Sequence, residues 1–296
     1  MSEDAVSAHY THGTLLAALE TALAKIGKTP ETVTVDDLAP ADEFHTGGRQ
    51  ASEAFLDQLG LSKTDHLLDV GCGLGGTSRF AASLYGARVT GIDLTGEFVE
   101  TGKALCRWVG LSDRVALHQG SALAMPFESE AFDGGYMMHV GMNIADKTGL
   151  FREVHRVLRP GAVFGVYDVM RFKDGALSFP VPWAETAATS AVAPPAAYRR
   201  ALEDAGFAIE GERNRRDYAL AFFEEMTARA KAAGARVVAR RSSEDGGRST
   251  PAAGGPPPLG IHVLMGPSTT GKIGNVIQNI AAGRVAPVEI IARKAS

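Results

Sequence analysis

The 296-residue sequence predicts an α/β fold in which helices cover both faces of a doubly wound sheet. From about residue 66 to residue 168, short apolar runs alternate with segments of helical spacing, and the connections between them are short. A glycine cluster, Asp69–Gly76, lies between the first apolar run and the first helix of this region. Because the carboxyl ends of parallel strands meet at one sheet edge, we expect the loops that follow them to form a site.

The N-terminal region precedes this alternation and is mainly helical. Residues 12–26 have leucines at helical spacing, and Gly27 is a natural stop. Residues 29–48 are loop-like, and a second helix over about 50–59 ends at Gly60. These elements are expected to lie outside the sheet.

The central region contains the strands and helices of the expected sheet. Each predicted strand is a short apolar run, and each predicted helix follows a strand with only a brief connection. The predicted strands are 66–70, 88–92, 114–118, 132–138 and 162–167, and the helices between them are 76–84, 96–109 and 146–157.

The alternation weakens beyond Asp168. We expect a loop over 170–193, a helix over 195–205, a strand over 207–212 and an amphipathic helix over 218–233. Residues 234–258 are rich in Arg, Ser, Gly and Pro and are predicted to be a mobile loop. A helix near 271–282 and a strand over 288–292 close the chain.

Composition excludes several classes of protein. The formal charge of −4 argues against a nucleic-acid binder, which normally has a basic face. The two cysteines imply no disulfide framework and fit a reducing compartment. The first residues are acidic without an apolar segment behind them, and no apolar run approaches the ~18 residues of a membrane span. We therefore expect a cytoplasmic protein without a nucleic-acid or membrane partner.

The glycine cluster is typical of a nucleotide-type ligand site. Its glycines permit close approach of a ligand, and the first N–H groups of the following helix are free to bind one. Asp93 ends the second strand, where a carboxylate can accept both hydroxyls of a ribose. The spacing also satisfies G-x-G-x-x-G, so a nicotinamide or flavin enzyme is an alternative. Two features oppose that alternative, because Asp69 is placed to receive the amino group of a methionine moiety and the chain has no Tyr-x-x-x-Lys.

Five motifs in order carry a resemblance to a known family: Leu67–Gly76, Gly91–Leu94, Ala124–Phe127, Phe132–Asp133 and Arg156–Gly161. With them, the segment from about residue 45 to 168 resembles the class I S-adenosylmethionine-dependent methyltransferases. It is most similar to the small-molecule branch that includes ubiquinone/menaquinone C-methyltransferases and glycine/sarcosine N-methyltransferases. The segment Phe44–Arg49 contains two adjacent glycines and also looks like a segment that some members have near the cofactor. The resemblance implies a Rossmann-like, mostly parallel sheet with one antiparallel C-terminal strand, S-adenosylmethionine as cofactor, and methylation of an O, N or C nucleophile.

The resemblance also implies roles for individual residues. Asp69 and the glycine backbone would hold the methionine part, Asp93 the ribose, and Leu94 would pack on adenine. Ser121 departs from the family, which usually has an acid at this position to accept a hydrogen bond from the adenine amino group. The implied cofactor-binding residues are Asp69, Gly71, Cys72, Gly73, Asp93, Leu94, Ser121, Ala122 and Met138.

Two side chains at strand ends are candidate catalytic residues. His139 directly follows the fourth strand, and Asp168 ends the fifth. A reference histidine pKa of about 6.5 suits base work at neutral pH. The alternatives are that His139 only packs beside the cofactor or donates a hydrogen bond, and that Asp168 caps the next turn. No metal site is predicted, and His9 and His12 have no acidic or cysteine companions at metal-ligand spacing.

The domain organisation follows from the resemblance. We expect an N-terminal helical lid over 1–48, a cofactor-binding core over 49–212, a cap insertion over 213–285 that contains loop 234–258, and a terminal core strand over 286–296. A second subunit could complete the cap as a homodimer. Gly266–Ile273 imitates a phosphate-binding loop but lacks the magnesium-binding hydroxyl, so we interpret it as a loop with a helix start.

The sequence does not identify the molecule that accepts the methyl group. The leading hypothesis is a small-molecule methyltransferase. The alternatives are an NAD(P)-dependent oxidoreductase and a non-catalytic cofactor-binding partner of another subunit.

Overall fold

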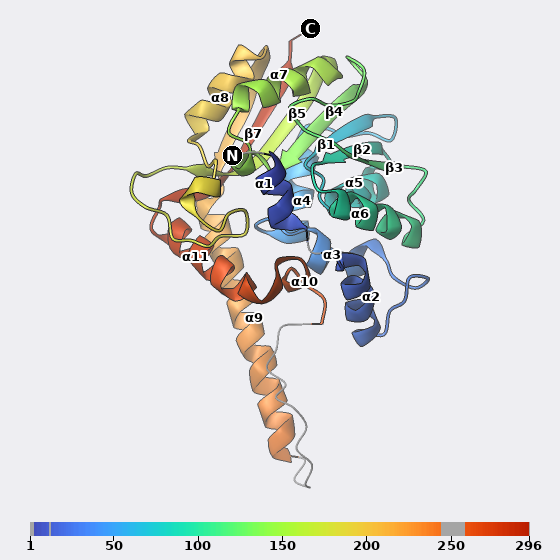
Figure 1. The fold of residues 1–296 in the computed structure, drawn as a ribbon, viewed down its shortest axis with the longest axis vertical. Coiled ribbons are helices and arrows are strands. Elements are labelled where there is room, and N and C mark those ends of the chain that lie inside the picture. The colour runs from blue at the N-terminus through green and yellow to red at the C-terminus, as the bar shows by residue number, and fades with distance from the viewer. Residues whose placement is uncertain (1–2, 12, 244–257, 296) are drawn as a thin grey trace.

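The computed structural model describes residues 3–11, 13–243 and 258–295, and for 230–243 only the helical path. Its centre is a seven-stranded sheet with strand order β3-β2-β1-β4-β5-β7-β6 (Figure 1). The neighbouring pairs among the first five strands are parallel, and β7 runs antiparallel to both β5 and β6. The strands are β1 (His66–Val70), β2 (Arg88–Asp93), β3 (Val115–Gln119), β4 (Phe132–Met138), β5 (Leu158–Arg171), β6 (Phe207–Asn214) and β7 (Val285–Lys294). The predicted fold class, with one antiparallel C-terminal strand, is confirmed.

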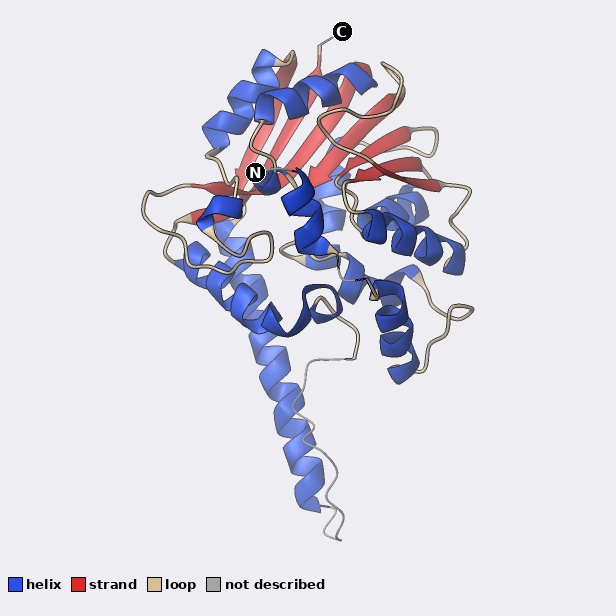
Figure 2. Cartoon of the chain, in the orientation of Figure 1, coloured by secondary structure: helices blue, strands red, loops and turns tan. Residues whose placement is uncertain are grey.

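Helices cover both faces of this sheet (Figure 2). On one face, α7 (Lys147–Val157) and α8 (Pro195–Asp204) pack on Phe164 and Val166 of β5. On the other, α4 (Gly48–Leu56), α5 (Gly76–Tyr85) and α6 (Gly96–Trp108) pack in a second cluster that contains Tyr136 and Tyr167. Alternate residues of β4 and β5 thus enter opposite cores, as the period of two in a strand requires.

A glycine in β5 allows α4 to pack closely against the sheet. A Cβ atom at Gly165 would lie 2.6 Å from the ring of Phe55, which belongs to α4. The missing side chain therefore lets Phe55 rest directly on the sheet, where it is fully buried. Burying an aromatic side chain of this kind stabilises a fold by about 1.5–3 kcal/mol.

The N-terminal region is more helical than the sequence indicated. It contains α1 (Glu3–Tyr10), α2 (Leu15–Lys25) and α3 (Val35–Asp42). The expected loop over 29–48 is therefore wrong at 35–42, where Thr34 and Asp37 form a capping box that begins α3. The predicted helix over 12–26 corresponds to α2, and His12 lies outside the described residues.

The C-terminal additions lie beyond the carboxyl edge of the parallel strands (Figure 1). They are α9 (Arg216–Ser243), α10 (His262–Met265) and α11 (Thr269–Ala281). The prediction of a mobile loop from residue 234 is wrong for 234–243, which continue α9, and its remainder over 244–257 lies outside the described residues. The predicted loop with a helix start is confirmed, because a 3-10 turn over Gly266–Ser268 leads into α11.

The segment before that turn is helical. A phosphate-binding loop follows a strand, whereas α10 precedes Gly266. No helix among the residues described has both the length and the apolar character that crossing a membrane would require.

Candidate functional site

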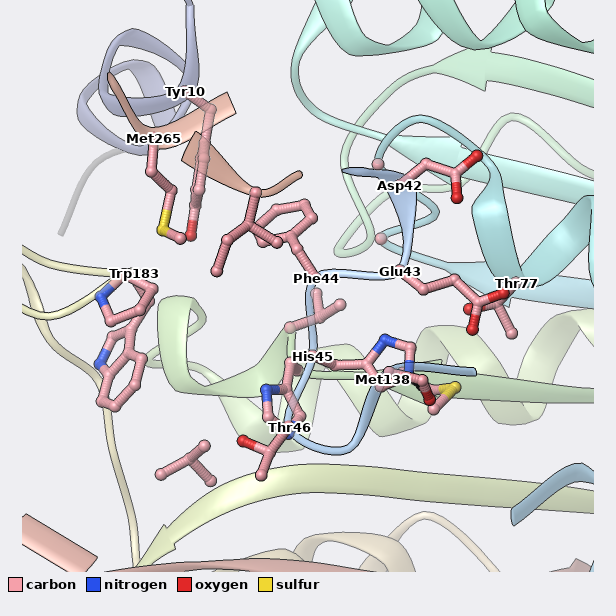
Figure 3. A pocket seen from close by; sticks show the side chains of 18 of the residues that line it. Tyr10, Asp42, Glu43, Phe44, His45, Thr46, Thr77, Met138, Trp183 and Met265 are labelled. Carbon is pink, nitrogen blue, oxygen red and sulfur yellow. Dashed lines mark hydrogen bonds between the residues drawn. The ribbon is translucent and has the colours of Figure 1, made fainter. Parts of the chain in front are cut away.

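A cavity of about 2060 Å³ opens at the carboxyl edge of the parallel strands. It is bounded by the β1–α5 loop, the ends of β2 and β4, the segment 42–50, and the additional helices α1, α9, α10 and α11. Ligand pockets usually measure about 300–1,000 Å³, so this cavity has room for two ligands side by side. Figure 3 shows it with side chains from these separate segments pointing inward.

The glycine cluster forms one wall of the cavity. Gly71 has φ +71°, and a Cβ there would lie 2.3 Å from Val140. Gly73 has φ +54°, but a Cβ there would meet no atom closer than 3.9 Å. Glycine at 73 is thus required by the backbone conformation, and it leaves open space in front of the peptide. This is the arrangement that a closely approaching ligand needs.

Two carboxylates flank this loop. Asp93 accepts hydrogen bonds from the backbone N–H groups of Gly73 (2.9 Å) and Thr95 (2.8 Å). Asp69 is 3% exposed and accepts a hydrogen bond from Ser78 Oγ at 2.6 Å. Burial raises the pKa of Asp69 to about 7 and also raises the pKa of Asp93. No cationic side chain contributes to the pKa of either carboxyl group. The two carboxylates therefore suit a ligand that brings its own positive charge and its own hydroxyl donors.

The remaining predicted cofactor residues lie close by, with one exception. Cys72, Leu94, Ala122 and Met138 line the cavity. Ser121 does not: its Oγ accepts from the N–H of Leu123 at 3.0 Å and donates to the carboxylate of Glu3 on α1. Glu3 itself lines the cavity. The structure therefore places a carboxylate beside Ser121, although it comes from a segment 118 residues away.

His139 lines the cavity in an unusual backbone conformation. Its φ is +56°, and its N–H donates to the Tyr167 carbonyl at 2.7 Å. Histidine is one of the few residues enriched in this left-handed region, and such strain clusters at functional sites. Its ring lies 6.0 Å from that of His45 and 5.1 Å from that of Tyr167.

The basicity of His139 differs from the sequence expectation. Burial, with a smaller contribution from His45, lowers the pKa of His139 well below its usual range. Burial likewise lowers the pKa of His45 to about 4. The expected base role depended on the reference pKa. With a lowered pKa both imidazoles are neutral at pH 7, and His139 is a weaker base than a histidine with the reference pKa. The Nε2 atom of His139 is buried and has no hydrogen-bond partner among the described residues.

Asp168 is not brought into the cavity. It is fully buried, accepts a hydrogen bond from the Tyr198 hydroxyl at 2.6 Å, and accepts the Val169 N–H at 2.8 Å. Burial raises its pKa to about 6. A Cβ at Gly141 would lie 2.4 Å from its carboxylate, so Asp168 packs beneath the turn that follows His139. Its place fits a positioning role better than contact with a ligand.

Several lining residues were not found from the sequence. Tyr10 reaches the cavity from α1 and donates to Asn143 at 3.4 Å. Glu43 and Arg49 form an ion pair in the segment beside the glycine loop, where Ser52 donates to Glu43 at 2.5 Å. The segment Phe44–Arg49, with its pair Gly47–Gly48, was the only sequence signal here, and it assigned no role to Glu43 or Arg49. Within the described part of the chain, no group of three or more His, Cys, Asp or Glu side chains could hold a metal ion.

Comparison with known proteins matches the central part of the chain to a family. Residues 68–166 match the family model described as a methyltransferase domain. A sterol 24-C-methyltransferase of Gibberella zeae is 36% identical over 110 residues, which are 37% of this chain and 29% of that protein. The match thus spans less than a third of that relative's length. The resemblance to the S-adenosylmethionine-dependent methyltransferases is confirmed for this domain.

Solved structures extend the likeness to the whole fold. Geranyl diphosphate C-methyltransferase from Streptomyces coelicolor A3(2), solved with Mg²⁺, geranyl-S-thiolodiphosphate and S-adenosyl-L-homocysteine, is 18% identical, with a TM-score of 0.68. The alignment covers 99% of this chain and 98% of that one. The [4+2]-cyclase SpnF is 21% identical with a TM-score of 0.65, over 100% of this chain and 97% of the cyclase. At these identities the likeness shows the fold, and fold alone does not fix the reaction.

Proposed function

We propose that this chain, whose residues 68–166 form a methyltransferase domain, is an S-adenosylmethionine-dependent enzyme that methylates an O, N or C nucleophile of a small molecule. The observation that carries this proposal is the convergence of Asp69, the open backbone at Gly73 and Asp93 at one end of a single cavity. Asp69 suits the ammonium and Asp93 the ribose of this cofactor, and the open backbone at Gly73 leaves room for its methionine part.

The residues toward the cofactor take the following proposed roles. The carboxylate of Asp69 accepts from the ammonium of the methionine part, and the glycine backbone leaves room for that part. Asp93 accepts from the ribose hydroxyls, and Leu94 packs against adenine. Glu3, held beside Ser121, supplies the carboxylate that the adenine amino group can donate to. The weak adenine contact implied by Ser121 alone is thereby strengthened.

The chemistry needs alignment more than proton transfer. When bound, the cofactor supplies an electrophilic methyl group on its sulfonium. The cavity walls orient the acceptor in line and exclude water. The neutral imidazole of His139 positions an acceptor group by hydrogen bonding, and Asp168 holds the turn that carries it. A low pKa makes His139 a weak base, so acceptors that are nucleophilic without strong base assistance are favoured.

The additional helices have a proposed part in this function. We infer that residues 1–48 act as a lid and that 213–285 form a cap over the core of 49–212, with the terminal strand in 286–296. Support comes from the cavity lining, to which α1, α9, α10 and α11 all contribute. We also propose that the protein forms a homodimer and that it is cytoplasmic. The second proposal is supported by the two free cysteines, which are typical of a protein in a reducing compartment.

Calorimetric titration tests the cofactor assignment. Purified protein is titrated separately with S-adenosylmethionine, NAD and NADP, and the titrations are repeated with Asp93→Ala. Asp113→Ala, which changes an exposed aspartate outside the cavity, is the matched control. Binding of S-adenosylmethionine alone, lost only in Asp93→Ala, is expected. Binding of a dinucleotide, or of none of the three, would contradict the proposal.

A further inference from the structure

The cavity has two ends of different chemistry. Asp42, Glu43 and the glycine loop lie at one end, and Trp183 with apolar side chains of α9, α10 and α11 forms the other. Figure 3 shows Asp42, Glu43 and Thr77 on one side and Trp183 and Met265 on the other. The apolar end is lined by Trp183, Phe222, Met226, Met265, Ile273 and Ile277.

The apolar end presents incompletely covered hydrocarbon. Phe222, Ile273 and Ile277 are only partly buried, and Met226 is 37% exposed. The one polar group of the Trp183 side chain is already satisfied, because its indole N–H donates to Ser190 at 3.0 Å. Lys272 on α11 does not line the cavity and pairs with Glu185 at 2.7 Å. Contiguous apolar surface of this kind marks a place where an apolar ligand binds.

The charged groups around the cavity oppose an anion. Eight carboxylate side chains line it among the described residues, but only two guanidinium groups do. Both guanidinium groups are already paired: Arg49 with Asp36 and Glu43, and Arg229 with Glu225. Burial keeps His45 and His139 neutral and, together with Lys25, lowers the pKa of His262, the third histidine that lines the cavity. No lining side chain of the described chain is therefore left as an unpaired cation at pH 7 for a phosphate or carboxylate.

We propose that the space between α9, α11 and Trp183 is the acceptor subsite, and that it takes an uncharged, largely apolar small molecule rather than an anionic one. This inference rests on the proposed function, because it assigns the other end of the same cavity to the cofactor. The cavity volume admits both ligands at once.

Two dyes that differ by one charged group test the inference directly. N-Phenyl-1-naphthylamine is neutral, and 8-anilino-1-naphthalenesulfonate is the same skeleton with a sulfonate. Fluorescence titrations are made with saturating S-adenosylmethionine, which keeps the dyes out of the cofactor end. We expect the neutral dye to bind at least about tenfold more tightly than the sulfonate.

A variant that introduces a positive charge tests whether the dye binds in this subsite. Ile277→Lys should weaken the neutral dye about fivefold and tighten the sulfonate, since a new cation then lies in the subsite. Gln278→Lys, on the exposed side of the same helix and outside the cavity, is the matched control and should change neither. Met226→Lys is a second variant at a more exposed position, in case Ile277→Lys fails to fold.

The outcomes separate this inference from the proposed function. Equal binding of the two dyes, displacement of the neutral dye by S-adenosylmethionine, or an unchanged dye preference in both lysine variants would overturn the subsite assignment. If the dyes discriminate as expected in cofactor-free protein but calorimetry shows no binding of S-adenosylmethionine, the site for an uncharged apolar ligand stands, and the methyltransferase proposal fails together with the name of acceptor subsite.

Discussion

With Asp69 as the proposed partner of the cofactor's ammonium group, its raised pKa should make cofactor affinity depend on pH in a defined direction. Burial raises the pKa of this carboxyl to about 7 in the free protein. An ammonium group can pair only with the ionised form, so binding should lower this pKa and displace a proton. S-Adenosylmethionine should therefore bind more tightly as the pH rises through 7, and the gain should level off above about pH 8.

The magnitude follows from the ionised fraction of Asp69. With a pKa of about 7, roughly 9% of the carboxyl is ionised at pH 6 and roughly 91% at pH 8. The association constant should thus rise about tenfold between these pH values. At pH 7, about half a proton should be released for each cofactor molecule bound, which calorimetry in buffers of different ionisation enthalpy measures.

Two controls isolate Asp69. 5′-Deoxy-5′-methylthioadenosine keeps the adenosine but lacks the amino acid, so the contribution of Asp93 remains while that of Asp69 disappears. Asp69→Asn keeps the size of the side chain and should lose the pH dependence, with affinity at pH 8 reduced by about 1.5–3 kcal/mol, the value of a hydrogen bond to a charged group. A wild-type affinity that changes less than about twofold from pH 6 to 8, or an equal slope for methylthioadenosine, would refute the reasoning.

Three further predictions concern stability and the lid. In chemical denaturation, Gly71→Ala should destabilise the fold by about 2–3 kcal/mol more than Gly161→Ala. Both glycines have positive φ, but only at Gly71 would a new Cβ lie 2.3 Å from a neighbour. Equal losses in the two variants would contradict the steric argument. The pKa of Asp168 is raised from 3.8 to about 6 in the folded protein, so its stabilising contribution is complete below pH 3.8 and is lost as the pH rises through 6. Between pH 3.5 and 7.5, the unfolding free energy of Asp168→Asn should therefore rise by up to about 3 kcal/mol relative to that of the wild type. A difference between the two proteins that does not change with pH would count against this. Glu3→Gln should weaken S-adenosylmethionine binding about fivefold, whereas the exposed Asp4→Asn on the same helix should not; equal effects would remove Glu3 from the site.

The sequence predicted the features that depend on residues close together in the chain. Short apolar runs between helical segments identified the strands, because a parallel strand that is covered on both faces is continuously apolar. The glycine cluster and Asp93 identified the cofactor end, because these groups sit at strand ends that a parallel sheet brings to one edge. The structure confirms that arrangement, with Gly73 and Asp93 joined by a 2.9 Å hydrogen bond.

Some elements escaped the sequence reasoning for local reasons. The helix α3 was interpreted as loop because Pro40 lies inside it, although the capping box at Thr34 was a signal for its start. The composition of 234–258 suggested mobility throughout, but residues 234–243, half of which are the good helix formers Ala and Arg, continue α9. A compositional argument averages over a segment and misses such a boundary.

Contacts between distant segments were decided only by the tertiary structure. The carboxylate beside Ser121 comes from Glu3, and Asp168 is turned toward Tyr198 instead of the cavity. The basicity of His139 likewise depends on what buries it. Sequence patterns report the period and turn chemistry of one segment, whereas burial, desolvation and the direction of a side chain are set by every segment packed around it. The sequence by itself therefore determined the sheet and the place of the glycine cluster and Asp93 at its edge, and the folded chain decided which side chains line the cavity and what charge they carry.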